Sequence, residues 1–411
     1  MYFYRIDKAL SASFLPDLPF PPAEAGQPTL FLTQRDPLRS RSAWRVTDGR
    51  QLTAEESVLW LDSGRISPEM PQLPPEVTAA IQAGTLTGVN LSHPRWREAL
   101  VFTAPKTGKK RVHLLAVGDV GSTLVTALKL MGGNDISHIG ICDLNEKAVA
   151  RWVTELGQID WPWDYGTLPE VEAVDSDRLF DCDVFIFAAA KAIPAVGSGV
   201  QDVRMAQLDA NRPLVETFAR QARKTGFRGL FMVLSDPIDP LCKAAWLASN
   251  RDETGRWDGL GLLPEQVQGF GLGVMNARAA YFAKQDPRFA SFLTEGRSFG
   301  PHGKGLVIAN SIHHYDDTLS RELTQVVETA NLRIRDLGFK PYVAPAVSSG
   351  AMQLLLALRG QWHCSSVPLG GVWFGVRNRF TPFGQETESL PLPEALFARL
   401  RETEAALASI L

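Results

Sequence analysis

The sequence predicts an α/β protein with a doubly wound parallel sheet, followed by an α+β region and preceded by a small α+β appendage. From residue 112 onward, uninterrupted apolar segments such as 183–190 alternate with amphipathic ones, as expected of parallel strands covered by helices on both faces. The first of these apolar segments ends in a glycine turn. The 411 residues, 45% of them hydrophobic, suffice for more than one core.

Composition excludes several classes of protein. The net charge of −3 gives no electrostatic attraction to nucleic acid or to an anionic membrane. No apolar run approaches membrane-spanning length, and residues 1–7 lack the pattern of an export signal. The four cysteines are scattered without C-x-x-C spacing, which argues against a structural zinc site and a disulfide framework. We therefore expect a cytoplasmic protein with no nucleic-acid or membrane partner.

The chain divides into three predicted regions. Residues 1–105 are rich in proline and form an appendage of unknown role, because short apolar runs at 29–33 and 58–61 predict strands and 75–81 predicts a helix. A polar linker ends at Arg111. A cofactor-binding domain is predicted over 111–240, and an α+β catalytic domain over 241–411.

The elements of the cofactor-binding region follow one another in regular alternation. Strands are predicted over 112–117, 138–142, 183–190 and 229–235, and helices over 121–131, 145–157 and 204–224. Beyond residue 240, two apolar stripes at helical spacing predict helices that face a core. These stripes comprise Leu323, Val326, Val327, Ala330, Ile334 and Leu337 in one helix, and Leu396, Phe397, Leu400, Leu407 and Ile410 in the other.

The glycine turn predicts a dinucleotide site of the Rossmann type. The strand ending at residue 117 breaks into A-x-G-x-x-G, with Gly118 and Gly121, and Asp143 ends the next apolar run. Free N–H groups at the start of a helix bind a pyrophosphate, and an acid one βαβ step later binds a ribose diol. Ala116 stands where the motif has its first glycine and makes the turn if its φ stays negative. The charge of Asp143 disfavours a 2′-phosphate, so NAD is expected rather than NADP.

Five further segments, in order, carry a resemblance to a known family. They are RMAQLDAN (204–211), LSDPID (234–239), GFGLGVMNAR (269–278), GPHG (300–303) and SVPLGGVWFG (366–375). Together with the glycine turn they resemble the motifs of the lactate/malate dehydrogenase family over roughly residues 111–411. The resemblance implies an NAD-dependent 2-hydroxyacid dehydrogenase that acts on a small 2-oxo or 2-hydroxy acid and forms a homo-oligomer, either a dimer or a tetramer.

The resemblance also assigns roles to individual residues. His302 would exchange a proton with the substrate oxygen, Arg278 would bind the substrate carboxylate through two parallel hydrogen bonds, and Arg204 would polarise the substrate carbonyl. The cofactor would be bound by Gly118, Val120, Gly121, Asp143 and Ala189.

Two positions depart from the family pattern. Met275 stands where the family has the aspartate that orients the catalytic histidine, and Asp236 stands where it has a substrate-contacting asparagine. Asp236 is thus a candidate catalytic residue that either partners the histidine or repels an anionic substrate. Since loss of the orienting carboxylate lowers rates by orders of magnitude, the alternative function is an impaired or repurposed member that binds a nucleotide or metabolite as a sensor or assembly module.

Two indications of substrate choice conflict. The loop 191–203 is longer than in the family and lacks the arginine of malate enzymes. With Ile193 and Val196 it favours a monocarboxylate or a bulkier apolar 2-oxo acid, and Lys191 offers a cation. In contrast, 342–346 resembles a segment of malate-type tetrameric enzymes. No metal site is predicted, because the adjacent residues His313 and His314 point apart on a helix or strand.

Overall fold

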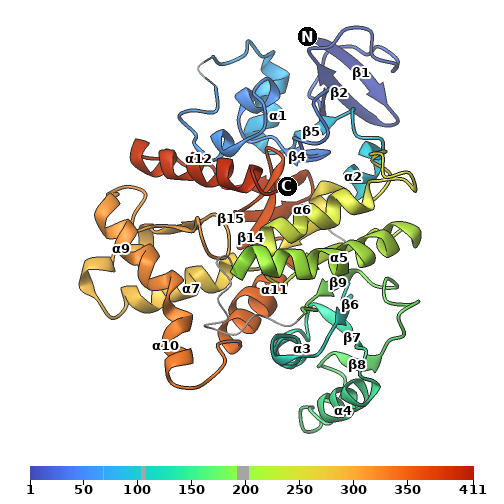
Figure 1. The fold of residues 1–411 in the computed structure, drawn as a ribbon. Helices are drawn as coiled ribbons and strands as arrows, with labels where there is room; N and C mark the ends of the chain where they lie inside the picture. Colours follow the sequence, from blue (N-terminus) through green and yellow to red (C-terminus); the bar gives the residue numbers. More distant parts are fainter. Residues whose placement is uncertain (68, 103–107, 192–202) are drawn as a thin grey trace.

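The computed structural model describes residues 1–67, 69–102, 108–191 and 203–411, with the side chains of residues 203 and 204 outside the description (Figure 1). A nine-stranded sheet runs through the molecule. Its strands are β6 (Lys110–Leu115), β7 (Ile136–Cys142), β8 (Glu170–Ala173), β9 (Val184–Phe187), β10 (Leu230–Val233), β11 (Val267–Gly269), β14 (His363–Leu369), β15 (Val372–Thr381) and β16 (Gly384–Thr387).

The order of these strands is that of a doubly wound sheet with an antiparallel extension. Strands β8, β7, β6, β9, β10 and β11 lie side by side in this order and are parallel. Strands β14, β15 and β16 continue the same sheet in antiparallel pairing. The predicted α/β class with a parallel sheet is therefore confirmed, and β8 is a strand that the sequence pattern did not reveal.

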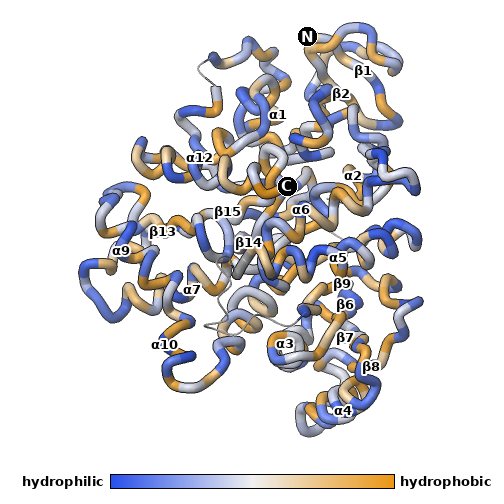
Figure 2. Tube along the Cα trace, viewed as in Figure 1, coloured by the Kyte–Doolittle hydropathy of each residue, from blue (hydrophilic) through white to orange (hydrophobic). Residues whose placement is uncertain are grey.

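Helices cover both faces of the parallel strands. On one face lie α3 (Asp119–Met131), α4 (Glu146–Gly157) and α11 (Met352–Leu358), and on the other lie α5 (Val203–Lys224) and α6 (Ile238–Ser249). Val184 and Ile186 of β9 pack in the first core, whereas Phe185 and Phe187 pack in the second. Successive side chains of a strand point to opposite faces, which explains the uninterrupted apolar runs. Figure 2 shows the hydrophobic residues gathered on these central strands.

The N-terminal residues form a mixed sheet of five strands in the order β1-β2-β3-β5-β4. Its elements are β1 (Tyr2–Ile6), β2 (Ala9–Ser13), β3 (Leu30–Thr33), β4 (Ala43–Arg45), β5 (Thr87–Asn90), the 3₁₀-helices η1 (Gly49–Leu52) and η2 (Val58–Leu61), α1 (Pro75–Ala83) and α2 (Trp96–Phe102). The predicted strand at 29–33 and helix at 75–81 are confirmed. The predicted strand at 58–61 is wrong, because Ser57 caps a 3₁₀ turn there and a short buried apolar run does not distinguish the two.

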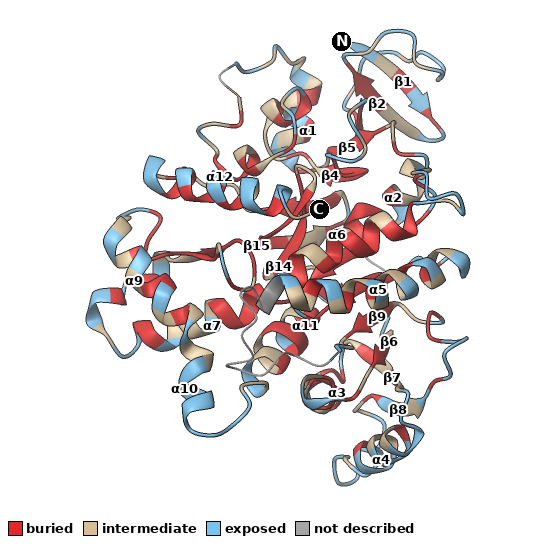
Figure 3. Ribbon diagram, in the orientation of Figure 1, coloured by how far each residue is buried: buried red, intermediate tan, exposed pale blue. Residues whose placement is uncertain are grey.

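The remaining elements follow β11. They are α7 (Leu272–Ala283), α8 (Phe292–Glu295), the hairpin of β12 (Arg297–Phe299) and β13 (Val307–Ala309), α9 (Asp317–Glu328), α10 (Ala330–Asp336), the π-helix η5 (Pro345–Ala351) and α12 (Glu394–Ala408). The core of the N-terminal sheet includes side chains of α12, so it is shared with the C-terminal part of the chain. Figure 3 shows α6 and the strands β14 and β15 as largely buried. No helix in the described part of the chain is long and apolar enough to cross a membrane.

One of the two predicted helical stripes is only half correct. Leu323 and Val327 are buried in α9, but the helix is interrupted at Thr329 and α10 contains no buried residue. Ile334 and Leu337 are exposed, by 40% and 70%, because the break turns the stripe away from the core. The stripe of α12 is confirmed, since four of its five residues are buried and Ile410 is partly buried against the same core.

Candidate functional site

The glycine turn between β6 and α3 has a strained residue where the motif lacks its first glycine. Ala116 has φ +78°, so the expectation of a negative φ is wrong. The conformation follows from the close approach of strand and helix. A Cβ atom at Gly121 would lie only 2.1 Å from the carbonyl oxygen of Ala116. The backbone of the turn therefore has the conformation of the glycine motif, although the first glycine is replaced by Ala116.

The start of α3 and Asp143 provide a surface suited to a dinucleotide. No side chain caps α3, and a Cβ at its N-cap residue Gly118 would meet no atom within 4 Å. The Asp143 carboxylate accepts hydrogen bonds from the N–H groups of Val117 (2.8 Å) and Asn145 (2.9 Å), which hold it beside the turn. The residues present thus fit a group with a pyrophosphate and a ribose diol.

The other two predicted cofactor residues lie at the same edge of the sheet. Val120 is a half-buried residue in the first turn of α3. Ala189 follows β9, the neighbour of β6, and its carbonyl accepts a hydrogen bond from the Ser235 hydroxyl at 2.8 Å. The carboxyl ends of parallel strands meet at this edge, where ligands of open α/β sheets bind.

His302 is held by a backbone carbonyl rather than by a carboxylate. Its Nδ1 lies 3.0 Å from the carbonyl oxygen of Gly271. A carbonyl only accepts, so Nδ1 carries the proton and Nε2 presents a lone pair in the neutral ring. Nε2 lies 3.9 Å from Oδ1 of Asp236, and the side chains of His302 and Asp236 are 17% and 49% exposed. Asp236 therefore lies on the Nε2 side of the ring and does not replace the missing partner of Nδ1.

A buried carboxylate supports the backbone of the same loop. The N–H of His302 donates to Oδ2 of Asp239 at 3.2 Å, and the Ser366 hydroxyl donates to the other oxygen. Burial raises the pKa of Asp239, while these two hydrogen bonds oppose the shift. Asp239 thereby links the start of α6, the His302 loop and β14.

A second support reaches His302 through Gly271. The Ser349 hydroxyl of η5 donates to the Gly271 carbonyl at 2.8 Å and accepts from the N–H of Val274 at 2.7 Å. A Cβ at Gly271 would lie 2.6 Å from Cβ of His302. The His302 side chain is thus packed against Gly271, whose carbonyl accepts the hydrogen bond from its Nδ1.

Arg278 is a half-buried cation near Asp236. Its Nη1 approaches Sδ of Met275 (3.7 Å) and the Val327 carbonyl (3.4 Å). Burial lowers the pKa of Arg278, whereas the negative charge of Asp236 raises it. Within the described ranges, no carboxylate lies within 4.0 Å of this guanidinium. Arg278 and His302 are therefore both within electrostatic reach of Asp236.

The third predicted substrate residue is only partly described. Arg204 lies in the first turn of α5, and its side chain lies outside the described residues, as do Ile193, Val196 and the rest of 192–202. Asn211 of α5 connects the neighbouring segments, because its Nδ2 donates to the Asp236 carbonyl (2.8 Å) and its Oδ1 accepts from the N–H of Lys191 (2.9 Å).

Several of these supporting residues were not predicted from the sequence. Asp239 and Asn211 lie inside the resembling segments, so their place in the motifs was a usable signal. Ser349 lies 78 residues after Gly271 and belongs to no such segment. Among the described residues, no group of three His, Cys, Asp or Glu side chains could hold a metal ion.

Comparisons with known proteins give related results for sequence and structure. No family model matches the chain. An L-lactate dehydrogenase of Corynebacterium jeikeium is 26% identical over 264 residues, which are 62% of this chain and 74% of that enzyme. Other curated L-lactate dehydrogenases match over about half of their length.

Two solved structures share the fold at low sequence identity. A lactate dehydrogenase from a deep-sea metagenome superposes with a TM-score of 0.59 at 18% identity, covering 74% of this chain and 98% of that one. Malate dehydrogenase of Archaeoglobus fulgidus, solved with NADH, gives a TM-score of 0.55 at 16% identity, covering 73% and 97%. Together with the ordered motifs, these matches make the chain similar in sequence to L-lactate dehydrogenases and similar in fold to lactate and malate dehydrogenases, at an identity that marks a divergent relative.

Proposed function

We propose that this protein is an NAD-dependent 2-hydroxyacid dehydrogenase, which transfers a hydride between NAD(H) and a small 2-oxo or 2-hydroxy acid. The observation that carries the proposal is the convergence of His302, Asp236 and Arg278 in one group. Asp236 lies 3.9 Å from the histidine and its charge acts on the arginine. The group combines a proton donor and acceptor with a cation for a carboxylate.

Each side chain has a task in this proposal. Arg278 binds the substrate carboxylate, and its burial strengthens the interaction because water competes less. His302 holds a proton at Nε2 and gives it to the substrate oxygen during reduction, or removes it during oxidation. The Gly271 carbonyl fixes the tautomer but supplies no full negative charge. Arg204 is proposed to polarise the substrate carbonyl.

The cofactor is proposed to lie along the glycine turn. NAD(H), when bound, supplies the hydride acceptor or donor. Gly118 and Gly121 permit close approach of the pyrophosphate to the backbone, and Val120 and Ala189 flank it. Asp143 accepts hydrogen bonds from the ribose hydroxyls, and its charge repels a 2′-phosphate. By the same family resemblance we propose a homo-oligomer.

The position of Asp236 favours a monocarboxylate substrate. Its carboxylate lies on the Nε2 side of His302, where the substrate oxygen must come. A negative charge there disfavours a second carboxylate on the substrate by like-charge repulsion. We therefore propose a 2-oxo monocarboxylate rather than a dicarboxylate.

The test is NADH oxidation measured with pyruvate, longer 2-oxo monocarboxylates and oxaloacetate. Replacement Arg278→Lys keeps the charge but loses the bidentate geometry, so we expect kcat/KM to fall at least about tenfold. Arg97→Gln on the exposed face of α2 serves as the matched control and should leave the rate unchanged. If NADH binds and none of these acids is reduced, the proposed activity is wrong.

Met275 supports a second candidate function. A thioether cannot stabilise an imidazolium ion, so the alternative is a protein that binds nucleotide or metabolite as a sensor or assembly module without turnover. A wild-type turnover number typical of dehydrogenases, about 10 s⁻¹ or more, would exclude this alternative.

A further inference from the structure

A pocket lies in the N-terminal sheet, away from the site described above. It has a volume of about 590 Å³, which is in the range of small-molecule sites. Residues after β2, such as Phe14, and after β3, such as Arg35, line it together with residues of the η1 end, such as Thr53. Strands β2 and β3 are parallel, so the pocket occupies the carboxyl edge of parallel strands, where α/β sheets bind ligands.

Arg35 brings a positive charge into this pocket. Its guanidinium packs over the rings of Trp44 and Trp60, at 4.8 and 5.3 Å from their centroids. Burial lowers the pKa of Arg35 to about 10. Nη2 donates to the Gln51 carbonyl, and Nη1 is buried without a hydrogen-bond partner. A half-buried guanidinium with one buried and unpaired nitrogen is costly, and an anion beside it would offset that cost.

The nearest buried carboxylate is already committed elsewhere. Glu56 accepts from the backbone N–H and Nε of Arg41 and from the Ser40 hydroxyl. Among the described residues, Arg35 has no carboxylate within 4.0 Å, although the charges of Glu56 and Glu55 act on it. The protein therefore leaves this guanidinium without a counter-ion of its own.

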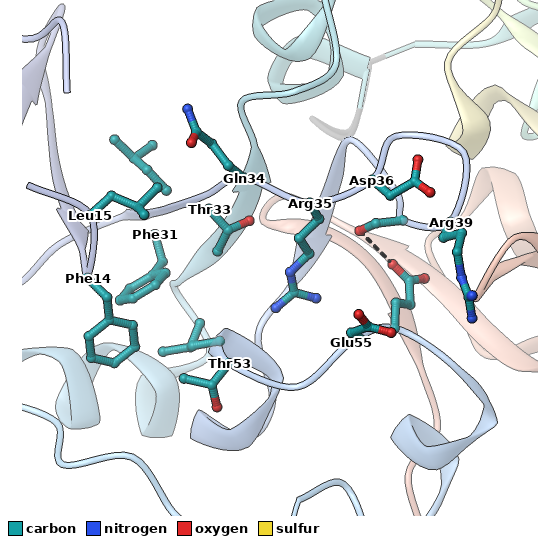
Figure 4. Close-up of a pocket in the computed structure, with 14 residues that line it drawn as sticks. Phe14, Leu15, Phe31, Thr33, Gln34, Arg35, Asp36, Arg39, Thr53 and Glu55 are labelled. Atoms are coloured by element: carbon teal, nitrogen blue, oxygen red, sulfur yellow. Dashed lines mark hydrogen bonds between the residues drawn. The ribbon is translucent and has the colours of Figure 1, made fainter.

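The two sides of the pocket differ in chemistry. In the view of Figure 4, Phe14 and Phe31 lie on one side of Arg35, and Glu55 and Asp36 on the other. The phenyl rings of Phe14 and Phe31 contact edge to face, with centroids 5.3 Å apart, which makes an apolar wall. Glu55 is exposed and makes no hydrogen bond or ion pair with a described residue.

We propose that this pocket binds a free α-amino acid with an apolar side chain. The ligand carboxylate meets Arg35, its ammonium group meets Glu55, and its side chain packs on Phe14 and Phe31. A zwitterion matches a rim that carries both signs of charge, and an apolar tail matches the wall. The site is separate from the His302 group, so it is a regulatory or carrier site that stands independently of the proposed activity.

Isothermal titration calorimetry of the full chain with L-phenylalanine and L-leucine tests the proposal. Phenylpyruvate lacks the ammonium group and phenethylamine lacks the carboxylate, so each should bind at least about tenfold more weakly than L-phenylalanine. The titrations are repeated in Arg278→Gln, which removes binding of carboxylates at the other site.

Three variants examine the pocket itself. Arg35→Met keeps the packing on the tryptophans and should weaken binding at least about tenfold, as should Glu55→Gln. Thr53→Trp fills the pocket from an exposed position and should abolish binding even if Arg35→Met fails to fold. Arg97→Gln is the matched control. Absence of binding, equal binding of phenylpyruvate, or binding unchanged in Thr53→Trp and Glu55→Gln would each overturn the proposal.

Discussion

Ala116 shows how one residue carries the strain of the glycine turn. Its φ of +78° lies in the left-handed region, which costs a residue with a Cβ about 1–2 kcal/mol. The turn does not relax, because Gly121 packs directly on its carbonyl. A glycine at position 116, as in the usual motif, would not carry this conformational strain.

Replacement Ala116→Gly should stabilise the protein by about 0.5–1 kcal/mol. The strain is released, and the gain is reduced by the greater freedom of glycine in the unfolded chain. Urea unfolding followed by circular dichroism measures the change. Ala150→Gly on the exposed face of α4 should have the opposite sign, a loss of about 0.5–1 kcal/mol. A destabilised Ala116→Gly variant would contradict the strain argument.

Replacement Met275→Asp should raise kcat about tenfold and move the pH optimum of oxo-acid reduction upward. In the proposed reaction the reduction requires a protonated His302 ring. By the family resemblance, a carboxylate at position 275 is the group that stabilises this ring, which the Gly271 carbonyl does not do. Steady-state NADH oxidation from pH 5 to 9 measures both effects. Met275→Asn has nearly the same shape without the charge, so an equal gain in that variant would show that charge is not the cause.

At the scale of elements, the candidate site depends on contacts between segments distant in sequence. The N-cap of α7 supplies Gly271 and its middle supplies Arg278. The loop before β13 supplies His302, and the turn before α6 supplies Asp236. The π-helix η5 fixes the start of α7 through Ser349. The positions of the site residues therefore depend on the packing of these elements against one another.

Replacement Ser349→Ala should destabilise the protein by about 1–3 kcal/mol. It leaves the N–H of Val274 and one acceptor site of the Gly271 carbonyl unsatisfied in a buried position. Thermal and urea unfolding measure the loss. The neighbour Ser348 makes no side-chain hydrogen bond with a described residue, so Ser348→Ala should change stability by less than about 0.5 kcal/mol. Equal losses in the two variants would refute the link.

At the scale of the whole molecule, the N-terminal sheet is fixed to the rest of the chain by buried polar contacts. The Glu265 carboxylate accepts from the N–H of Ala43 (2.9 Å) and the Ser42 hydroxyl (3.0 Å). Arg45 of β4 pairs with Glu386 of β16 at 2.6 Å. These contacts and the shared core join the appendage firmly to the C-terminal strands.

Replacement Glu265→Gln should make the protein more stable than the wild type, by a margin that grows with pH. Burial raises the pKa of Glu265 above its ordinary value of 4.5. The folded state thus binds this proton more tightly than the unfolded chain, so its contribution to stability is complete below 4.5 and is lost as the pH rises. Glutamine keeps an oxygen that accepts the hydrogen bond from the Ala43 N–H, and it does not ionise, so it loses no stability as the pH rises. Urea unfolding from pH 4 to 8 measures the margin, and a margin independent of pH would contradict the assignment.

The sequence predicted the parallel sheet and the segments of the candidate site, because both depend on local patterns. Apolar runs revealed β6, β7, β9 and β10, and the ordered motifs pointed to His302 and Arg278, each of which lies near Asp236. It failed where distant contacts decide the outcome. The φ of Ala116 goes with the close approach of Gly121 to its carbonyl, and the support from Ser349 has no local signature. The run at 58–61 is buried in either conformation, so its pattern could not distinguish a strand from a 3₁₀ turn.

The core shared by the two ends of the chain affects the order in which the protein can fold during synthesis. The N–H of Val58 donates to Glu404, 346 residues later, and Trp60 packs in the same core as Leu396 and Leu400 of α12. At about 5–20 residues per second, a ribosome needs roughly 20–70 s to deliver the second half of that core. During this interval the nascent N-terminal sheet lacks the α12 side chains that complete its core, so its apolar face stays open to water.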